Sequence, residues 1–200
     1  MAELLSTYIQ RGTTPKKDLF SSWGILLKTA KLINIPKLKE PHKRSWLDEQ
    51  GDDEYLPEEP TFQAYTVNVE FAYIGAKDTF QNQLRSFCNY LQGGEFNFFD
   101  VHYKSGIRCR YDSYDETYKQ RINSDIFIFT IVFKVNQPLC VGFYTSERTF
   151  TKTSLISATY HWSDGVTNRF TPGTITHTFP SSGDNFVIVI PDKAGDIFTD

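Results

Sequence analysis

Side chains able to do acid–base or metal chemistry are few and scattered along the chain. Asp100 and His102 stand two residues apart, so on a strand they would share one face and could move a proton or hold a metal. No third partner accompanies them, which favours a surface hydrogen bond. A second cluster, Asp112, Asp115 and Glu116, has the carboxylates that glycoside hydrolysis uses, but a polar turn explains the same composition. We therefore expect no enzyme.

Motifs for nucleotides, zinc and nucleophilic catalysis are absent from the sequence. It contains no glycine-rich phosphate loop, no His-Glu-x-x-His and no Gly-x-Ser-x-Gly. Cys88, Cys109 and Cys140 are widely spaced and stand apart from the four histidines, so we expect free thiols in a reducing cytoplasm rather than a zinc centre. Arg108 and Arg110 form an isolated pair and the net charge is −3, so no specific nucleic-acid binding is expected. We expect no cofactor and no metal.

One candidate contact for a partner lies near the C-terminal end. Tyr160 and Trp162 precede a Ser-Asp-Gly turn at residues 163–165. An aromatic ring beside such a turn can stack on a sugar ring, whereas a tryptophan packed in the core is the alternative. A carbohydrate-binding module that used these two rings would expose both on a flat or grooved face.

Composition indicates a folded, strand-rich chain. Of the 200 residues, 40% are hydrophobic and 22% are charged, which is close to the globular average and excludes disorder along the whole chain. The aromatic share of 16% is high, and the 17 phenylalanines and 11 tyrosines favour strands and interfaces. No apolar run approaches the roughly 18 residues of a membrane helix, so no membrane insertion is expected. Residues 1–10 lack the pattern of a signal peptide.

Alternation with a period of two locates the strands that build the core. Residues 65–73 carry apolar side chains at odd positions and mostly polar ones at even positions, which predicts a strand with one buried face. Residues 95–103 and 107–114 alternate on either side of a turn expected at 104–106. Residues 125–135 are apolar on both faces, which predicts a central strand covered on both sides.

A helix is predicted at residues 78–92. Asp78 is a suitable N-cap, Gln81 stands in the capping-box position, and two glycines at 93–94 end the pattern. Apolar side chains at helical spacing form one continuous stripe, which indicates core packing. The stripe consists of Phe80, Leu84, Phe87, Cys88 and Leu91.

The two ends of the chain are less regular. Residues 2–18 are polar and favour an arm or loop, and the apolar run at 23–27 predicts a short buried strand. An Asn-Gln-Pro break at 136–138 separates residues 1–138 from a small β-rich C-terminal unit, residues 139–200. Its strands are expected at 149–153, 155–162, 174–179 and 185–190.

Residues 37–60 are the most unusual segment. They contain three prolines and no periodic apolar pattern, and the basic residues precede most of the acidic ones. A loop of this length is commonly either functional or mobile. One interpretation is a mobile, solvated loop. The other is a functional arm that lies on a neighbouring subunit, where a basic stretch meets an acidic one. The candidate contact residues of this arm are Lys37, Lys39, Lys43, Arg44, Trp46, Asp48, Asp52, Asp53, Glu54 and Tyr55.

The order and spacing of these features resemble the N-terminal domain of phage and prophage distal tail proteins, the baseplate-hub proteins of long-tailed phages. The resemblance is especially to versions found in Bacteroides-type phages. It covers residues 20–138, and no single motif in it is specific. The matching features are the Trp-Gly-Ile-Leu-Leu run at 23–27, the charged loop ending near Tyr55, the strand at 65–73, the helix at 78–92 with its Gly-Gly stop, Phe96 to Phe99, the hairpin around Tyr111 and the strand at 127–138.

The resemblance implies a mainly β (α+β) fold, a β-sandwich or split barrel flanked by one α-helix. Members of the family form rings of identical subunits, usually hexamers, that join the tail tube to the tail tip or to receptor-binding proteins, and they catalyse nothing. The chain would then be a virion protein, made in the cytoplasm of a bacterial host, with other phage tail proteins as partners. A tail-tube or tail-completion protein is the alternative, because those folds share the sandwich and the helix. A carbohydrate-binding module is the further alternative.

Overall fold

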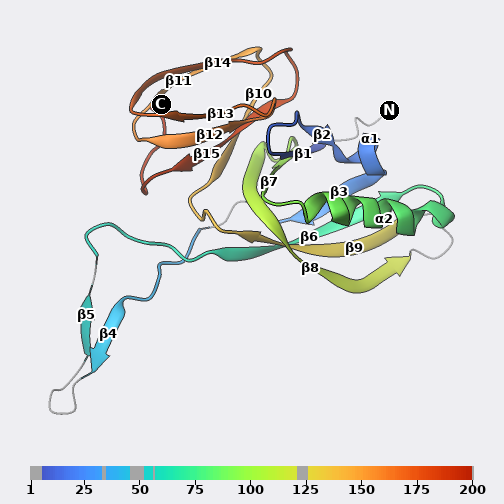
Figure 1. Ribbon diagram of the computed structural model, residues 1–200, viewed down its shortest axis with the longest axis horizontal. Coiled ribbons are helices and arrows are strands. Elements are labelled where there is room, and N and C mark those ends of the chain that lie inside the picture. The colour runs from blue at the N-terminus through green and yellow to red at the C-terminus, as the bar shows by residue number, and fades with distance from the viewer. Residues whose placement is uncertain (1–5, 33–34, 46–51, 56, 121–125, 200) are drawn as a thin grey trace.

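The computed structural model describes residues 6–32, 35–45, 52–55, 57–120 and 126–199. Within these ranges the protein is mainly β, as expected. Antiparallel strands form one seven-stranded sheet, one four-stranded sheet and two two-stranded sheets, accompanied by two helices. In Figure 1 the C-terminal strands lie beside one end of the seven-stranded sheet, and the thin pair β4–β5 projects away from both.

The seven-stranded sheet is built from residues that precede 136. Its order is β2-β1-β7-β8-β9-β6-β3. The bounds are Thr7–Arg11 for β1, Lys17–Asp18 for β2, Ile25–Ala30 for β3, Tyr65–Ile74 for β6, Phe96–Asp100 for β7, Ser105–Gln120 for β8 and Ile126–Val135 for β9. Residues 2–18 are therefore not simply an arm or loop, because β1 pairs with β7 and buries Ile9 completely.

The alternation expected in β6 is confirmed, since Val67, Val69 and Phe71 are buried on one face. Strand β9 lies between β8 and β6, as a central strand should. Its alternate residues are buried, while the others are half-buried, so only one of its faces is fully covered. The turn between β7 and β8 comes earlier than expected, because Ser105 already pairs with Asp100.

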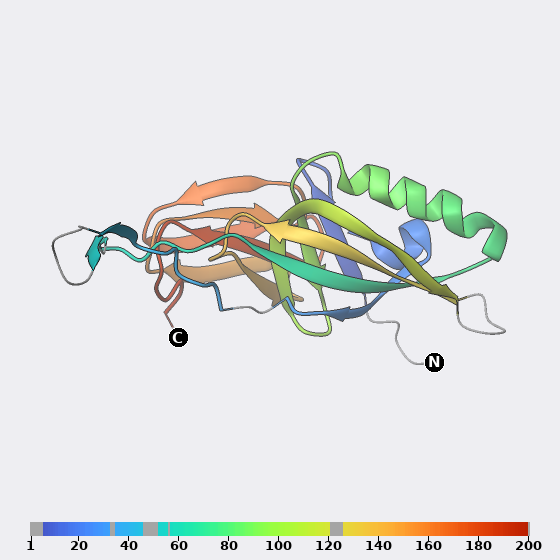
Figure 2. The same ribbon diagram turned by 90° about the horizontal axis from the view of Figure 1, so that it is seen from below.

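The predicted helix is confirmed as α2, Lys77–Leu91, and it covers one face of the sheet (Figure 2). Phe80, Phe87 and Leu91 are buried against the sheet. The expected cap is wrong: the N-cap is Ala76, which makes no side-chain hydrogen bond, and Asp78 lies within the first turn. The chain enters the helix earlier than the capping pattern implied, and a carboxylate in the first turn still favours the helix dipole.

A second helix replaces part of the strand expected at 23–27. Helix α1 spans Leu19–Trp23, and Asp18 caps it by accepting a hydrogen bond from the Ser21 backbone N–H at 2.7 Å. Gly24 ends the helix in the left-handed conformation, with φ of +68°, which glycine adopts without steric cost. Strand β3 begins immediately afterwards.

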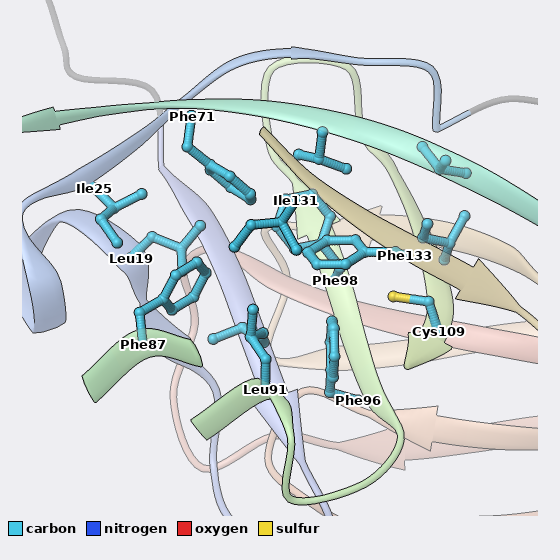
Figure 3. Packing of buried hydrophobic residues seen from close by; sticks show 14 of the residues in the cluster. Leu19, Ile25, Phe71, Phe87, Leu91, Phe96, Phe98, Cys109, Ile131 and Phe133 are labelled. Carbon is cyan, nitrogen blue, oxygen red and sulfur yellow. The ribbon is translucent and has the colours of Figure 1, made fainter. Parts of the chain in front are cut away.

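Aromatic rings fill the core between α2 and the sheet (Figure 3). Phe71 is central: its ring centroid lies 5.5 Å from that of Phe87, 6.1 Å from Phe98 and 5.6 Å from Phe129. Edge-to-face and offset pairs at such spacings add to the free energy of burial. The high phenylalanine content thus builds a rigid body.

The C-terminal strands form a small sandwich of a four-stranded sheet, ordered β10-β15-β12-β13, and the pair β11-β14. The bounds are Val141–Thr145 for β10, Thr149–Ser154 for β11, Ala158–Trp162 for β12, Thr167–Phe170 for β13, Gly173–Thr178 for β14 and Asn185–Pro191 for β15. The four strands expected from the sequence have counterparts here, whereas β10 and β13 were not expected. The division of the chain into two domains at residue 138 stays a prediction.

Strand β15 contributes to both cores. Phe186 and Ile188 belong to the cluster of the seven-stranded sheet, whereas Val187 and Val189 belong to that of the C-terminal sandwich. Phe186 also stacks on Phe99 of β7 with ring centroids 4.7 Å apart. Because alternate residues of a strand point to opposite faces, one strand joins the two clusters.

Candidate assembly arm

The segment between β3 and β6 contains a hairpin, which the sequence did not predict. Strand β4, His42–Ser45, pairs antiparallel with β5, Asp52–Tyr55. The register places Lys43 opposite Glu54 and Arg44 opposite Asp53. Opposite charges at facing positions favour the pairing of two strands. The sorted charges of this segment therefore fall at facing positions in the register of one hairpin.

At its base, the hairpin is held by a second set of contacts. A β-bridge joins Leu38 to Phe62, the Lys39 N–H donates to the Thr61 carbonyl at 2.8 Å, and the Gln63 N–H donates to the Lys37 carbonyl at 2.8 Å. We call residues 37–60 the arm, and the described residues on either side of the hairpin, 35–41, 55 and 57–63, the arm root. Figures 1 and 2 both show β4 and β5 extending beyond the sheets, away from the body.

The arm root exposes apolar side chains. Ile35 is 90% exposed, Tyr55 72% and Leu38 58%. A cavity of about 420 Å³ opens at the same place. Its apolar wall consists of Leu38, Pro41, Tyr55, Pro57 and Pro60.

The ten residues expected in the arm do not form one compact site. Lys37 and Lys39 are exposed at the arm root, whereas Lys43 and Arg44 lie on β4. Asp52, Asp53, Glu54 and Tyr55 make up β5. Trp46 and Asp48 lie outside the described residues. Sequence reasoning named the charges but missed Ile35 and Leu38, whose exposure no local pattern signals.

Tyr160 and Trp162 are not exposed, which corrects the expected contact with a glycan or partner. Both are completely buried in the C-terminal core. The Tyr160 hydroxyl donates to Ser154 Oγ at 3.0 Å, and Trp162 Nε1–H donates to Asn168 Oδ1 at 2.9 Å. The pair β11–β14 packs over this part of the sheet, so neither ring is open to a sugar.

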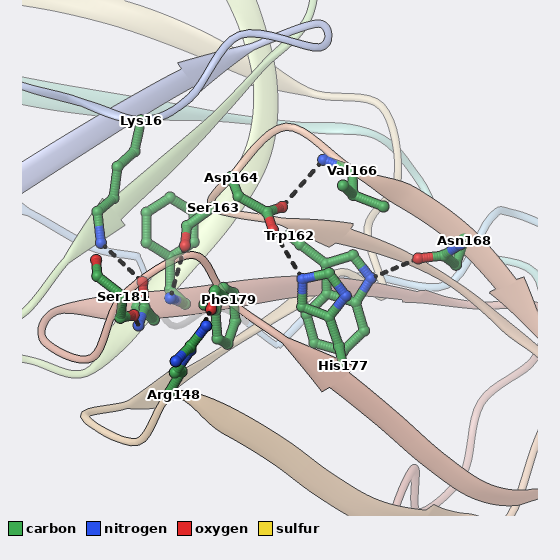
Figure 4. A network of polar contacts seen from close by, with 12 residues as sticks. Lys16, Arg148, Trp162, Ser163, Asp164, Val166, Asn168, His177, Phe179 and Ser181 are labelled. Atoms are coloured by element: carbon green, nitrogen blue, oxygen red, sulfur yellow. Dashed lines mark hydrogen bonds and ion pairs between the residues drawn. The ribbon is translucent and has the colours of Figure 1, made fainter.

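The ring of His177 lies against that of Trp162 (Figure 4). Its ring stacks on the tryptophan with centroids 4.1 Å apart, and its Nε2 lies 2.9 Å from Asp164 Oδ2. Asp164 also accepts a hydrogen bond from the Val166 N–H. This network closes the β12–β13 turn over the core, and it has the geometry of a structural contact.

Asp100, Arg108 and Arg110, which were considered in the sequence, make polar contacts within the fold. Asp100 is buried and accepts hydrogen bonds from Thr7 Oγ1 and from the Tyr103 N–H, each at 2.9 Å. Arg108 pairs with Glu95 at 3.1 Å and Arg110 with Asp112 at 3.4 Å.

The three cysteines are free thiols, and burial raises the pKa of each. Among the described residues, no group of three or more His, Cys, Asp and Glu side chains could hold a metal ion. In the same part of the chain, no helix has the length and apolar character needed to span a membrane.

Comparisons with known proteins find similarity among solved structures alone. No family model and no curated protein matches the sequence. Among solved structures, the chain is similar to the SPP1 Dit protein (gp 19.1), described as a paradigm of the hub adsorption apparatus in phages that infect Gram-positive bacteria. The two share 11% identity over 92% of this chain and 98% of that one, with a TM-score of 0.48.

Proposed function

We propose that this chain is a structural component of a phage tail: a ring-forming distal tail protein that joins the tail tube to the tail tip or to receptor-binding proteins. The observation that carries the proposal is the arm. It extends from the body as an isolated two-stranded hairpin with exposed apolar residues at its root. An isolated hairpin is marginally stable in water, so such a structure calls for a partner.

The body supports this role through its rigidity. The stripe of α2 packs on a sheet whose core is largely aromatic, and β15 ties the C-terminal sandwich to the same core. Close-packed interiors hold surface elements in fixed positions. A ring of identical copies needs such a body, because each copy must present the arm and the facing surface at the same angle.

The order of elements in residues 20–138 supports the phage assignment, because it follows the pattern of distal tail proteins described above. In such a ring, each subunit contact should bury more than about 1,000 Å² in total. Contact between copies would also cover exposed apolar surface, which otherwise promotes nonspecific aggregation.

Deletion of the hairpin tests the proposal. Removing residues 42–58 leaves the contacts between Lys39 and Thr61 in place and closes them with four residues, a length that hairpin loops commonly have. We expect the full chain to form rings, seen by light scattering and negative-stain imaging. The deletion variant should be a folded monomer, whose circular dichroism differs only by the loss of the short hairpin. A full chain that is monomeric throughout, or a deletion variant that still forms rings, would count against the arm.

A further inference from the structure

A lysine and an asparagine that are far apart in the sequence meet where the loop after β1 touches the start of β15. Lys16 Nζ donates a hydrogen bond to Asn185 Oδ1 at 3.2 Å and another to the Asp184 carbonyl. The carbon that a nucleophile would attack, Asn185 Cγ, is bonded to that same Oδ1. An amine and a carboxamide carbon held this close are the two reactants of a transamidation.

Other contacts hold both side chains in place. Asn185 Nδ2 donates to the Ser181 carbonyl at 2.8 Å, and because a carbonyl only accepts, this bond fixes the amide with its oxygen toward Lys16. Asn185 is only 6% exposed, so water has little access to its amide. The Lys16 backbone N–H donates to the Ser163 carbonyl at 2.8 Å. Figure 4 shows the Lys16 side chain extending toward the turn that carries Ser181.

Burial favours the neutral, nucleophilic form of the Lys16 amine. The side chain is half-buried, and burial is the largest of the causes that leave the pKa of Lys16 below its ordinary value. The charges of Asp184 and Asp164 and the face of the Tyr8 ring, 4.9 Å away, favour the ammonium and offset part of this effect. Lysine amines made less basic by burial serve as nucleophiles in proteins.

Asp184 supplies the acid–base group that a transamidation needs. Its Oδ2 accepts a hydrogen bond from the Tyr8 hydroxyl and its Oδ1 accepts one from the Tyr144 hydroxyl, each at 3.0 Å. The carboxylate is thereby fixed on the residue before Asn185, near enough to Lys16 to act on its charge. Positioned carboxylates take up and return protons in such steps.

We propose that Lys16 and Asn185 form an intramolecular isopeptide bond. The neutral amine attacks Asn185 Cγ, the bond from Cγ to Nδ2 breaks, and the proton that Nζ gives up passes by way of Asp184 to the departing nitrogen. One amide replaces another and one ammonia is released, so the step consumes no oxidant or reductant. The bond joins positions 169 residues apart and ties the large sheet to the C-terminal sandwich. It goes beyond the tail role, because it needs no partner.

Mass spectrometry of the full-length chain tests the bond directly. After incubation at mildly alkaline pH, which favours the neutral amine, the denatured chain should weigh one ammonia less than its sequence. Trypsin should then release a branched peptide in which residues 12–17 are joined to residues 170–193, because it does not cleave after an acylated lysine. The full sequence mass, or a mass deficit without this branched peptide, would overturn the proposal.

Lys16→Arg is the variant that isolates the nucleophile, because it keeps a positive charge and a long side chain but has no amine able to attack. It should show the full sequence mass, and on a denaturing gel it should migrate more slowly than the crosslinked chain. Lys28→Arg is the matched control, since Lys28 lies on β3 and pairs with Glu70 at 2.8 Å, and it should keep the mass deficit. A branched peptide containing residues 170–193 that persists in Lys16→Arg would assign the crosslink to another lysine and refute the pair.

Discussion

His161 lies on β12, and its Nδ1 is 3.0 Å from Thr167 Oγ1. Burial is the main cause that lowers the pKa of His161 to about 4, from an ordinary value of 6.5. The positive charge of Arg108 lowers this pKa further, and Glu95 acts in the opposite direction. The neutral imidazole is therefore the form that the folded chain accommodates, since the charged form would lose hydration beside a guanidinium group.

This environment predicts an acid-sensitive stability. Between pH 6.5 and about 4 the unfolded chain binds more protons at His161 than the folded chain, so the free energy of unfolding falls as the pH falls through that window. His161→Asn keeps a polar group near Thr167 and removes the titration. In urea unfolding at pH 7 and pH 5, the variant should lose less stability than the unmodified chain. An equal loss in both would assign the acid sensitivity to another group.

Residue-level burial was hard to predict because it depends on contacts far along the chain. Tyr160 and Trp162 precede a turn, which is compatible with exposure as well as with packing. The burial of these two rings is decided by strands β11 and β14, which cover the sheet. His177 on β14 stacks directly on Trp162. Nothing near residue 162 in the sequence signals that cover.

At the scale of elements, the sequence predicts the helices and strands whose apolar periodicity is visible within the element itself. Strand β6 and helix α2 were located correctly because their apolar periods run over several turns or pleats. Strand β1 and helix α1 are short, and they are stabilised by partners distant in sequence. The arm was predicted as a charged segment, but its hairpin depends on the pairing of two short strands, neither of which carries a recognisable pattern of its own.

The contact between two turns gives a second prediction. Gly165, in the β12–β13 turn, has φ of +95°, and a Cβ built there would lie 2.3 Å from the Thr13 carbonyl oxygen. The Lys16 N–H donates to the Ser163 carbonyl at 2.8 Å at the same junction. Gly165→Ala therefore adds a clash with backbone to the strain of a positive φ. We expect it to cost about 3 kcal/mol or more of unfolding free energy.

Gly183→Ala is the matched control. Gly183 also has a positive φ, +126°, but nothing lies within 4 Å of a Cβ built there. This substitution should cost only the backbone strain, about 1–2 kcal/mol. Similar losses for the two variants in chemical denaturation would show that the two turns do not pack as closely as described.

At the scale of the whole molecule, β15 makes the two cores interdependent, because its alternate residues enter different clusters. Gly142 of β10 also lies directly against Gly106 of β8, where a Cβ would meet backbone atoms at 2.5 Å. Neither glycine has a side chain, so the two backbones approach closely. Such continuity favours unfolding in one step.

Tryptophan fluorescence can test that cooperativity. Trp23 lies in the first core and Trp162 in the second, and the chain contains three tryptophans in all. Variants that retain only Trp23 or only Trp162, with phenylalanine at the other two positions, report on each core separately. In each variant, the thermal transition seen by fluorescence should coincide with that seen by far-ultraviolet circular dichroism. Two separated midpoints would mean that the sandwich unfolds on its own.

The shared strand also constrains how this molecule can be changed by recombination. A C-terminal unit that is joined only by a linker can be replaced by an unrelated domain without loss of the first core. Here the exchange would remove Phe186 and Ile188 from beneath the large sheet and leave Phe99 without its stacking partner. Novel sequence is therefore more readily accommodated as insertions in solvent-facing turns, such as that around Gly183, than by replacement of everything beyond residue 138.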